Sequence, residues 1–217
     1  MKIWEISKRG IVRYDSAEGV SNMNFNTTHE FVLASASPRR RELFGLLHIP
    51  FEIITSDVEE TSVKAEDVQQ YVTEVALLKT RDVAKKCPQK TVIGADTIVV
   101  YEDRLLHKPV SHEEAVRHLQ TLSGDAHAVL TAVAIITPDG RESTFVEKTT
   151  VVFKDVPQAM IEAYVASGDP FDKAGGYGIQ TDGVFFVERI EGDYNNVVGL
   201  PLASLVERLL SLHYISI

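Results

Sequence analysis

FVLASASPRRRELFGLL, residues 31–47, carries the clearest structural pattern in the chain. A short apolar run ends in two serines, and Pro38 follows Ser37 where a helix would begin. Serine is a favoured N-cap residue and proline suits the first helical position. The sequence therefore predicts a strand over residues 31–35 and a helix from about Arg39 to residue 47.

Three arginines occupy the first turn of this predicted helix: Arg39, Arg40 and Arg41. Each cation beside the positive end of the helix dipole costs about 0.3–1 kcal/mol, so stability alone does not explain the cluster. A bound anion would reverse the sign of that interaction. Backbone N–H groups, guanidinium groups and the hydroxyls of Ser35 and Ser37 together predict a phosphate-binding helix start. The alternative is a strand-to-helix turn whose arginines point to solvent.

The rest of the chain alternates between strand and helix patterns. Residues 1–29 have no sustained period and are interpreted as an N-terminal extension with a short strand at 2–6, followed by one domain over residues 30–217. Further strands are expected at 51–55, 91–100, 127–137, 142–152 and 184–190, and further helices at 66–86, 111–122, 157–167 and 202–212. This order is typical of an α/β protein.

Asp96 interrupts the apolar segment VIGADTIVV, residues 92–100, which reads as a strand buried between two layers. An unpaired carboxylate there would cost several kcal/mol in desolvation, so Asp96 needs a cation, a metal or a hydrogen-bonding role. Gly94 in the same strand indicates a close backbone approach.

Three further groups of charged residues are candidates for a site. Glu59 and Glu60 lie side by side in an irregular segment, where they would hold a divalent cation or form a solvated acidic loop. Lys79 falls within the long predicted helix, where a lysine is ordinarily solvated. Asp172 and Lys173 lie in GDPFDKAGGYGIQTDG, residues 168–183, whose glycines would let backbone amides approach a ligand closely.

Five stretches of the chain resemble one known family in order. LASASPRRREL is similar to the signature of the Maf family, nucleotide pyrophosphatases of the Maf/Ham1 superfamily. The other matches are VEE at 58–60, GADTIV at 94–99, KP at 108–109 and DKAGGYGIQ at 172–180. The resemblance covers about residues 31–212. This sequence has a residue of the expected kind at every charged site position of the family.

This resemblance implies an elongated mixed β-sheet flanked by helices, with two lobes and a central cleft. It also implies hydrolysis of a nucleoside triphosphate between the α and β phosphates with a divalent cation, Mg²⁺ or Mn²⁺, as cofactor. The implied catalytic residues are Asp96, Glu60, Lys79 and Lys108, with Glu60 and Asp96 as metal ligands. The implied substrate-binding residues are Ser35, Ser37, Arg39, Arg40, Thr97, Asp172, Lys173 and Gln180. Asp96 matches the proposed proton acceptor of the family, and whether it acts as base or metal ligand stays open.

The combination of Arg39, Thr97 and Gln180 resembles the subgroup that prefers dTTP and UTP. The Gln180 amide offers a donor and an acceptor to the edge of a uracil or thymine ring. The alternative function is a nucleotide-binding regulator of cell division or arrest with little turnover, a role suggested for bacterial relatives.

Composition narrows the function classes further. The 217 residues are 44% hydrophobic and 24% charged, and the net charge of −9 argues against a general duplex-DNA binder. No Walker A, GxGxxG or GxSxG motif is present, and the single Cys87 has no thiol partner. No apolar stretch is long enough to span a bilayer, so we expect no membrane association and a cytoplasmic protein, and the family resemblance implies a homodimer.

Overall fold

The computed structural model describes residues 3–6, 11–15, 23–59 and 63–217. Within this part of the chain, nine strands form one mixed sheet in the order β1-β2-β4-β3-β5-β7-β8-β9, with β6 paired to β5. Strand β3 is parallel to β4 and β5, and the other pairs are antiparallel. The strands are β1 (Ile3–Ile6), β2 (Ile11–Asp15), β3 (Phe31–Ala34), β4 (Phe51–Ile53), β5 (Thr91–Tyr101), β6 (Arg104–Leu106), β7 (Ala126–Ile136), β8 (Glu142–Phe153) and β9 (Val187–Glu191).

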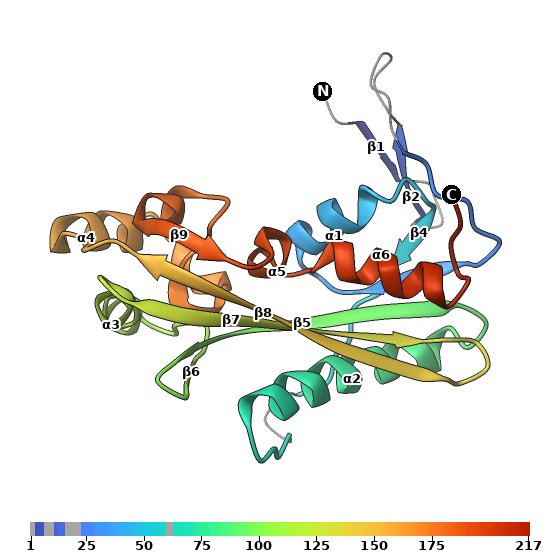
Figure 1. Cartoon of the computed structure of the whole chain (residues 1–217), viewed down its shortest axis with the longest axis horizontal. Coiled ribbons are helices and arrows are strands. Elements are labelled where there is room, and N and C mark those ends of the chain that lie inside the picture. Colours follow the sequence, from blue (N-terminus) through green and yellow to red (C-terminus); the bar gives the residue numbers. More distant parts are fainter. Residues whose placement is uncertain (1–2, 7–10, 16–22, 60–62) are drawn as a thin grey trace.

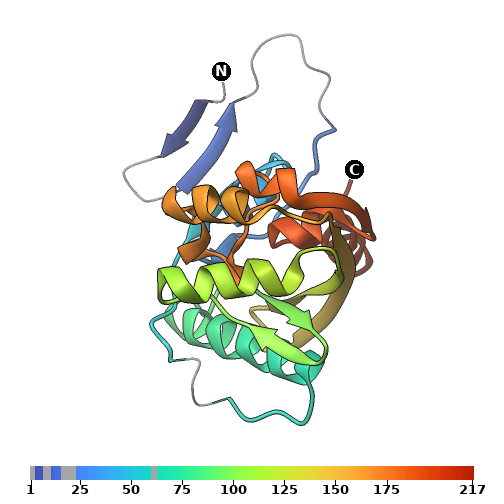
Figure 2. The ribbon, with the colours of Figure 1, turned by 90° about the vertical axis from the view of Figure 1, so that its left-hand side faces the viewer.

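Helices cover both faces of this sheet. They are α1 (Pro38–Gly45), α2 (Val68–Lys86), α3 (His112–Leu122), α4 (Gln158–Ala166), α5 (Tyr194–Val198) and α6 (Leu202–Ser211). Strands β5, β7 and β8 form the long axis of the molecule, with α2 on one face and α1, α5 and α6 on the other (Figure 1). Helices α3 and α4 lie at the end of this axis that faces the viewer in Figure 2. The predicted α/β class, with an elongated mixed sheet flanked by helices, is confirmed.

None of the helices in the described part of the chain has the length and apolar character needed to span a bilayer.

The two faces of β5 belong to different parts of the core. Ile93 and Val99 pack in the large cluster that includes residues of α1 and α6, whereas Ile98 and Val100 pack against α2. Successive side chains of a strand point to opposite faces. Asp96 therefore faces α2, and its neighbour Thr97 faces α1 and α5.

The two edges of β5 also differ. One edge is paired with β7 from Val92 to Val100. The other edge is shared, because β3 pairs with β5 only as far as Gly94 and β6 pairs with it only from Val99. Among the described strands, none pairs with residues 95–98 on this edge. The sheet is therefore interrupted where β3 ends, and ligands of α/β sheets commonly bind beyond the carboxyl ends of strands.

Most element predictions are confirmed within a few residues. Ser37 is the N-cap of α1, and its side chain accepts a hydrogen bond from the Arg40 backbone N–H at 3.4 Å. The strand expected over residues 184–190 begins only at Val187, because Asp182–Phe186 forms a 3-10 turn. Helix α5 was not predicted, because five residues are too few to show a helical period.

The predicted N-terminal extension, residues 1–29, contributes strands to the sheet. The strand expected at residues 2–6 corresponds to β1, with Lys2 outside the described residues, and β2 pairs antiparallel with β4. The division between extension and domain at residue 30 stays a prediction.

Gly94 allows α2 to pack directly on β5. A Cβ atom at this position would lie 2.1 Å from Thr80 Oγ1 and 3.2 Å from Thr80 Cβ. Thr80 is fully buried, and its hydroxyl donates to the Ala76 carbonyl at 2.6 Å. The close backbone approach predicted at Gly94 is therefore an approach to a helix.

We expect Gly94→Ala to lower the free energy of unfolding by about 1–3 kcal/mol, because the added methyl group overpacks the β5–α2 contact. Urea unfolding of Gly94→Ala, Thr80→Ala and the double variant measures the effect. The double variant should lose less stability than the two single variants do in total, since Thr80→Ala removes the clashing hydroxyl. Additive losses would show that the clash is not the cause.

Candidate functional site

A cavity of about 640 Å³ opens at the interruption of the sheet, with walls from the β3–α1 junction, α2, β5, the segment after β6, the glycine-rich segment and the end of α5. It is lined by these residues implied by the family resemblance: Ser35, Ser37, Arg39, Arg40, Lys79, Asp96, Thr97, Lys108, Asp172, Lys173 and Gln180. Glu60, expected as a catalytic residue and metal ligand, lies outside the described residues. The structure thus brings distant motifs to one cavity, and the roles of their residues stay predictions.

Asp96 and Lys79 form an ion pair in this cavity. Lys79 Nζ donates to Asp96 Oδ1 at 2.7 Å, and the side chains are 20% and 12% exposed. The sequence required a cation, a metal or a hydrogen-bonding role for Asp96, and the structure supplies a cation. Lys79 is thus directed toward the sheet and is not a solvated surface lysine.

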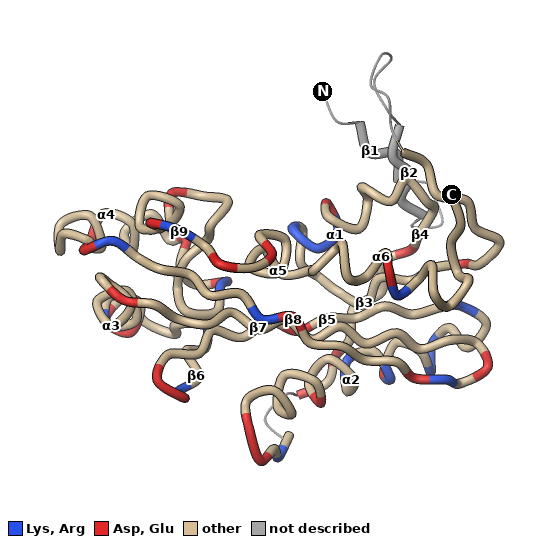
Figure 3. Tube along the Cα trace, viewed as in Figure 1, with Lys and Arg blue, Asp and Glu red and all other residues tan. Residues whose placement is uncertain are grey.

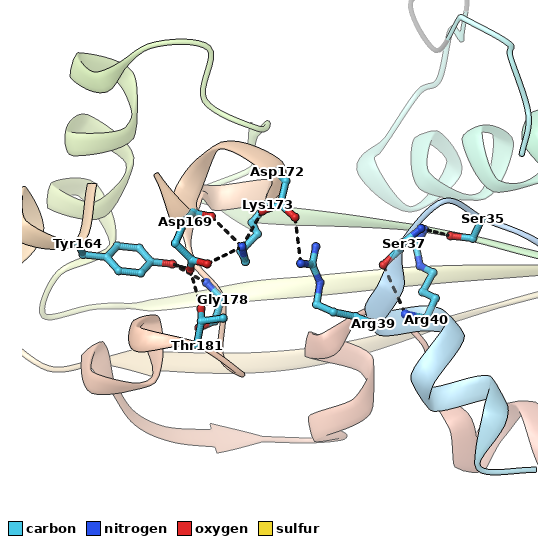
Figure 4. A network of polar contacts seen from close by, with 10 residues as sticks. All are labelled: Ser35, Ser37, Arg39, Arg40, Tyr164, Asp169, Asp172, Lys173, Gly178 and Thr181. Atoms are coloured by element: carbon cyan, nitrogen blue, oxygen red, sulfur yellow. Dashed lines mark hydrogen bonds and ion pairs between the residues drawn. The ribbon is translucent and has the colours of Figure 1, made fainter. Parts of the chain in front are cut away.

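The serines at the start of α1 organise the backbone of the turn. Ser35 Oγ accepts a hydrogen bond from the Ser37 N–H at 3.1 Å, and Ser37 Oγ accepts from the Arg40 N–H (Figure 4). Two of the amides predicted to bind phosphate therefore already have partners within the protein. The basic residues of α1 form one continuous segment at the start of the helix (Figure 3).

Arg40 connects three elements around the cavity. Its Nε donates to the Gly199 carbonyl at 2.7 Å, and its Nη2 donates to Thr97 Oγ1 at 2.8 Å. This guanidinium group therefore ties α1 to β5 and to the end of α5. Arg39 reaches the other wall, where its Nη1 donates to Asp172 Oδ2 at 3.0 Å.

Lys173 is held by acceptors within its own segment. Its Nζ donates to the Asp169 carbonyl at 2.7 Å, to Asp169 Oδ1 at 3.0 Å and to Asp172 Oδ1 at 2.6 Å. An ammonium group has three N–H donors, so these acceptors match its capacity. Burial alone would raise the pKa of Asp172, but the hydrogen bonds from Lys173 and Arg39 outweigh it and lower that pKa.

Asp169, which the sequence did not single out, is the centre of the glycine-rich segment (Figure 4). Its Oδ2 accepts hydrogen bonds from the Tyr164 and Thr181 hydroxyls, the latter at 2.6 Å. The Tyr164 oxygen in turn accepts from the Gly178 N–H at 2.9 Å. Asp169 thus joins Lys173 to the turn that carries Gln180. An aspartate next to a proline in a loop gives no periodic signal, which is why sequence reasoning missed it.

Two of the glycines in this segment serve its own packing. A Cβ atom at Gly178 would lie 2.5 Å from Thr181 Oγ1 and 2.6 Å from Lys173 Cε. A Cβ atom at Gly183 would lie 2.7 Å from the Gly178 carbonyl oxygen. The close approaches that we expected between these glycines and a ligand occur here between parts of the protein.

Comparison with known proteins supplies the family. The family described as Maf-like protein matches residues 30–212. The chain belongs to the Maf family. It is 48% identical over 180 residues to the dTTP/UTP pyrophosphatase of Geobacillus sp. (strain WCH70), a match that covers 83% of this chain and 96% of that protein.

A dTTP/UTP pyrophosphatase of Bacillus anthracis is 50% identical over 180 residues, with 83% of this chain and 94% of that protein covered. Among solved structures, a HAM1 protein from Coxiella burnetii matches with 15% identity and a TM-score of 0.48, covering 85% of this chain and all of that one, 100%. The family assignment rests on the sequence matches.

One wall of the cavity in this Maf-family chain rests on a buried histidine. His127 Nε2 and the Tyr177 hydroxyl are 2.7 Å apart, and Tyr177 lines the cavity. Burial disfavours the charged imidazole and lowers the pKa of His127 to about 4, against a smaller opposing effect of the Asp125 carboxylate.

This burial makes stability depend on pH. An unfolded histidine takes up a proton near pH 6.5, whereas the folded one resists until about pH 4, so the unfolded state binds more protons between these values. Above about pH 6.5 this histidine does not lower the free energy of unfolding. As the pH falls toward 4, protonation of the unfolded state lowers the free energy of unfolding by up to about 3 kcal/mol.

Urea unfolding of the wild type and of His127→Gln at several pH values isolates the effect, because the carboxylates titrate in both proteins. We expect the wild type to lose more stability than the variant between pH 6.5 and 4. Parallel curves for the two proteins would contradict the assignment to His127.

Proposed function

We propose that this chain is a nucleoside triphosphate pyrophosphatase that hydrolyses dTTP and UTP to the monophosphate and pyrophosphate. The observation that carries the proposal is the Lys79–Asp96 pair, 2.7 Å apart in a cavity where the edge of β5 is open. Family membership supports it, since relatives at 48% and 50% identity are named dTTP/UTP pyrophosphatases.

The positions of the charged residues support the following roles. Asp96 is the carboxylate that accepts a proton from the attacking water or positions that water. Arg39, Lys79 and Lys108 line the cavity and place positive charge where a triphosphate carries negative charge. In the Arg39–Asp172 pair the side chains are 28% and 61% exposed, so a phosphate oxygen can replace Asp172 as the partner of Arg39 at modest cost.

A divalent cation, Mg²⁺ or Mn²⁺, is the proposed cofactor. Among the described residues no group of three His, Cys, Asp or Glu side chains forms a complete metal cage. Mg²⁺ is usually held by one or two carboxylates together with substrate phosphates and water, and Asp96 fits that arrangement. Glu60 is the second proposed ligand. When bound, the cation offsets charge on the leaving pyrophosphate.

Thr97 and Gln180 are proposed to select the base. Both line the cavity, and Gln180 is exposed on its wall. A site whose polar groups pair with one base strongly rejects bases that leave those site groups unpaired. The discrimination is larger than the one produced by an added or missing methyl group. This favours thymine and uracil over the other bases, while tolerating the C5 methyl group that distinguishes them.

A cytoplasmic location and a homodimeric assembly stay predictions. The alternative of a nucleotide-binding regulator with little turnover is separated from the proposed enzyme by measuring turnover of the purified protein with Mg²⁺.

We expect Asp96→Asn to reduce kcat by about 10²–10⁴-fold while the protein stays folded, because the change removes a proton acceptor and little volume. Steady-state pyrophosphate release and thermal melts measure the two properties. Glu142→Gln is the matched control, because Glu142 forms an ion pair with Arg81 at 2.6 Å outside the cavity. Near-normal turnover of Asp96→Asn would remove Asp96 from the mechanism.

Pyrophosphate, rather than orthophosphate, should be the first inorganic product, because the proposed cleavage lies between the α and β phosphates. Chromatography of early time points with dTTP and UTP separates the products. A nucleoside diphosphate with orthophosphate would show that the wrong bond was assigned.

In the same assay dTTP and UTP should have higher kcat/KM than CTP, ATP, GTP and 7-methyl-GTP.

A further inference from the structure

A chain of hydrogen bonds runs from the cavity wall into the core on the α5 face of β5. Arg40 Nη2 donates to Thr97 Oγ1 at 2.8 Å, and Thr97 Oγ1 lies 2.9 Å from Thr131 Oγ1 on β7. The Thr131 hydroxyl donates to the Asn196 backbone carbonyl at 2.9 Å.

The direction of every bond in this chain is determined by its ends. A threonine hydroxyl has one hydrogen and two lone pairs, a guanidinium group only donates, and a carbonyl only accepts. The hydrogen of Thr131 goes to the Asn196 carbonyl, so the bond between the two threonines must use the hydrogen of Thr97. Thr97 then keeps one lone pair, since Arg40 takes the other, and it has no hydrogen left to donate.

Burial keeps this direction in place. Thr131 and Asn196 are both 0% exposed, so water cannot supply a substitute partner. Asn196 is itself held, because its Nδ2 donates to the Val129 carbonyl and to Thr149 Oγ1, each at 3.0 Å. Thr97 is half-buried and lines the cavity, so its remaining lone pair is the part of the chain that a ligand can reach.

We infer that Thr131 is a positioning residue for nucleotide selection: it fixes the Thr97 hydroxyl as a hydrogen-bond acceptor, so a bound nucleotide must present an N–H or O–H donor to it. This inference rests on the proposed function. Two groups of the nucleotide can donate this hydrogen bond. Uracil and thymine carry an N–H at ring position 3, whereas cytosine has a bare lone pair there. The sugar can donate instead through its 3′-hydroxyl, which dTTP and UTP share.

Calorimetric binding of α,β-methylene analogues, which resist the proposed cleavage, tests the inference without turnover. The probes are the analogues of UTP, CTP and 3′-deoxy-UTP, with Mg²⁺ present. If the donor is the base N–H, the wild type should bind the UTP analogue roughly tenfold or more tightly than the CTP analogue. If the donor is the 3′-hydroxyl, it should bind the UTP analogue that much more tightly than the 3′-deoxy-UTP analogue.

Thr131→Val frees the Thr97 hydrogen and should reduce that preference several-fold. If Thr131→Val loses its preference for the UTP analogue over the CTP analogue, the donor is the base N–H. If it loses its preference for the UTP analogue over the 3′-deoxy-UTP analogue instead, the donor is the sugar hydroxyl. Thr131→Ser keeps the hydroxyl and should restore the wild-type ratio.

Thr149→Val is the matched control. It removes an equally buried hydroxyl that contacts Asn196, but one that lies outside the chain to Thr97. It should lower the melting temperature without changing either ratio.

Unchanged ratios in Thr131→Val, or equal changes in Thr149→Val, would overturn the inference while leaving the pyrophosphatase proposal intact. Failure of all three analogues to bind the wild type would overturn both.

Discussion

The incomplete pairing of β5 is the constraint on which the site depends. One edge of β5 is hydrogen bonded to β7, and the other is shared between β3 and β6. The parallel pairing of β3 with β5 directs the end of β3, and therefore the start of α1, toward the unpaired residues 95–98. A longer β3 or an earlier β6 would close this edge and leave no place for the cavity.

Polar groups around this opening are organised mainly by one another. Arg40 holds the end of α5, and Asp169 holds Lys173 and the Gly178–Thr181 turn through side-chain and backbone contacts. These contacts pre-organise the cavity walls before a ligand arrives, which lowers the entropy cost of binding. The cations that face the cavity are therefore of two kinds. Some are held within the protein, and some, such as Arg39, have an exposed partner that is readily exchanged.

Sequence reasoning recovered what is encoded locally. The N-cap at Ser37, the amphipathic α2 and the buried strand around Asp96 each leave a pattern within a few residues, and each was confirmed. The need of Asp96 for a partner was predicted from desolvation, but the identity of the partner was not. Lys79 is an ordinary helix lysine until α2 is placed on the sheet.

Part of what the sequence did not reveal depends on contacts between distant residues. Arg40 and Gly199 are 159 positions apart, and no local pattern links them. The pairing of β2 with β4 is of the same kind. The five-residue α5 and the Asp169 contacts are local but were also missed, because a five-residue helix is too short to show a period and the Asp169 loop has none. Family resemblance supplied the list of site residues, while the geometry showed which of them hold the cavity together.

The alternation of side chains along β5 separates two neighbouring residues. Asp96 faces α2 and Lys79, whereas Thr97 faces Arg40 and the core beneath α5. Asp96 and Thr97 share no side-chain partner among these contacts. If the proposed roles hold, substitutions on one face of β5 can alter nucleotide recognition while the residues proposed for bond cleavage on the opposite face are under separate selection.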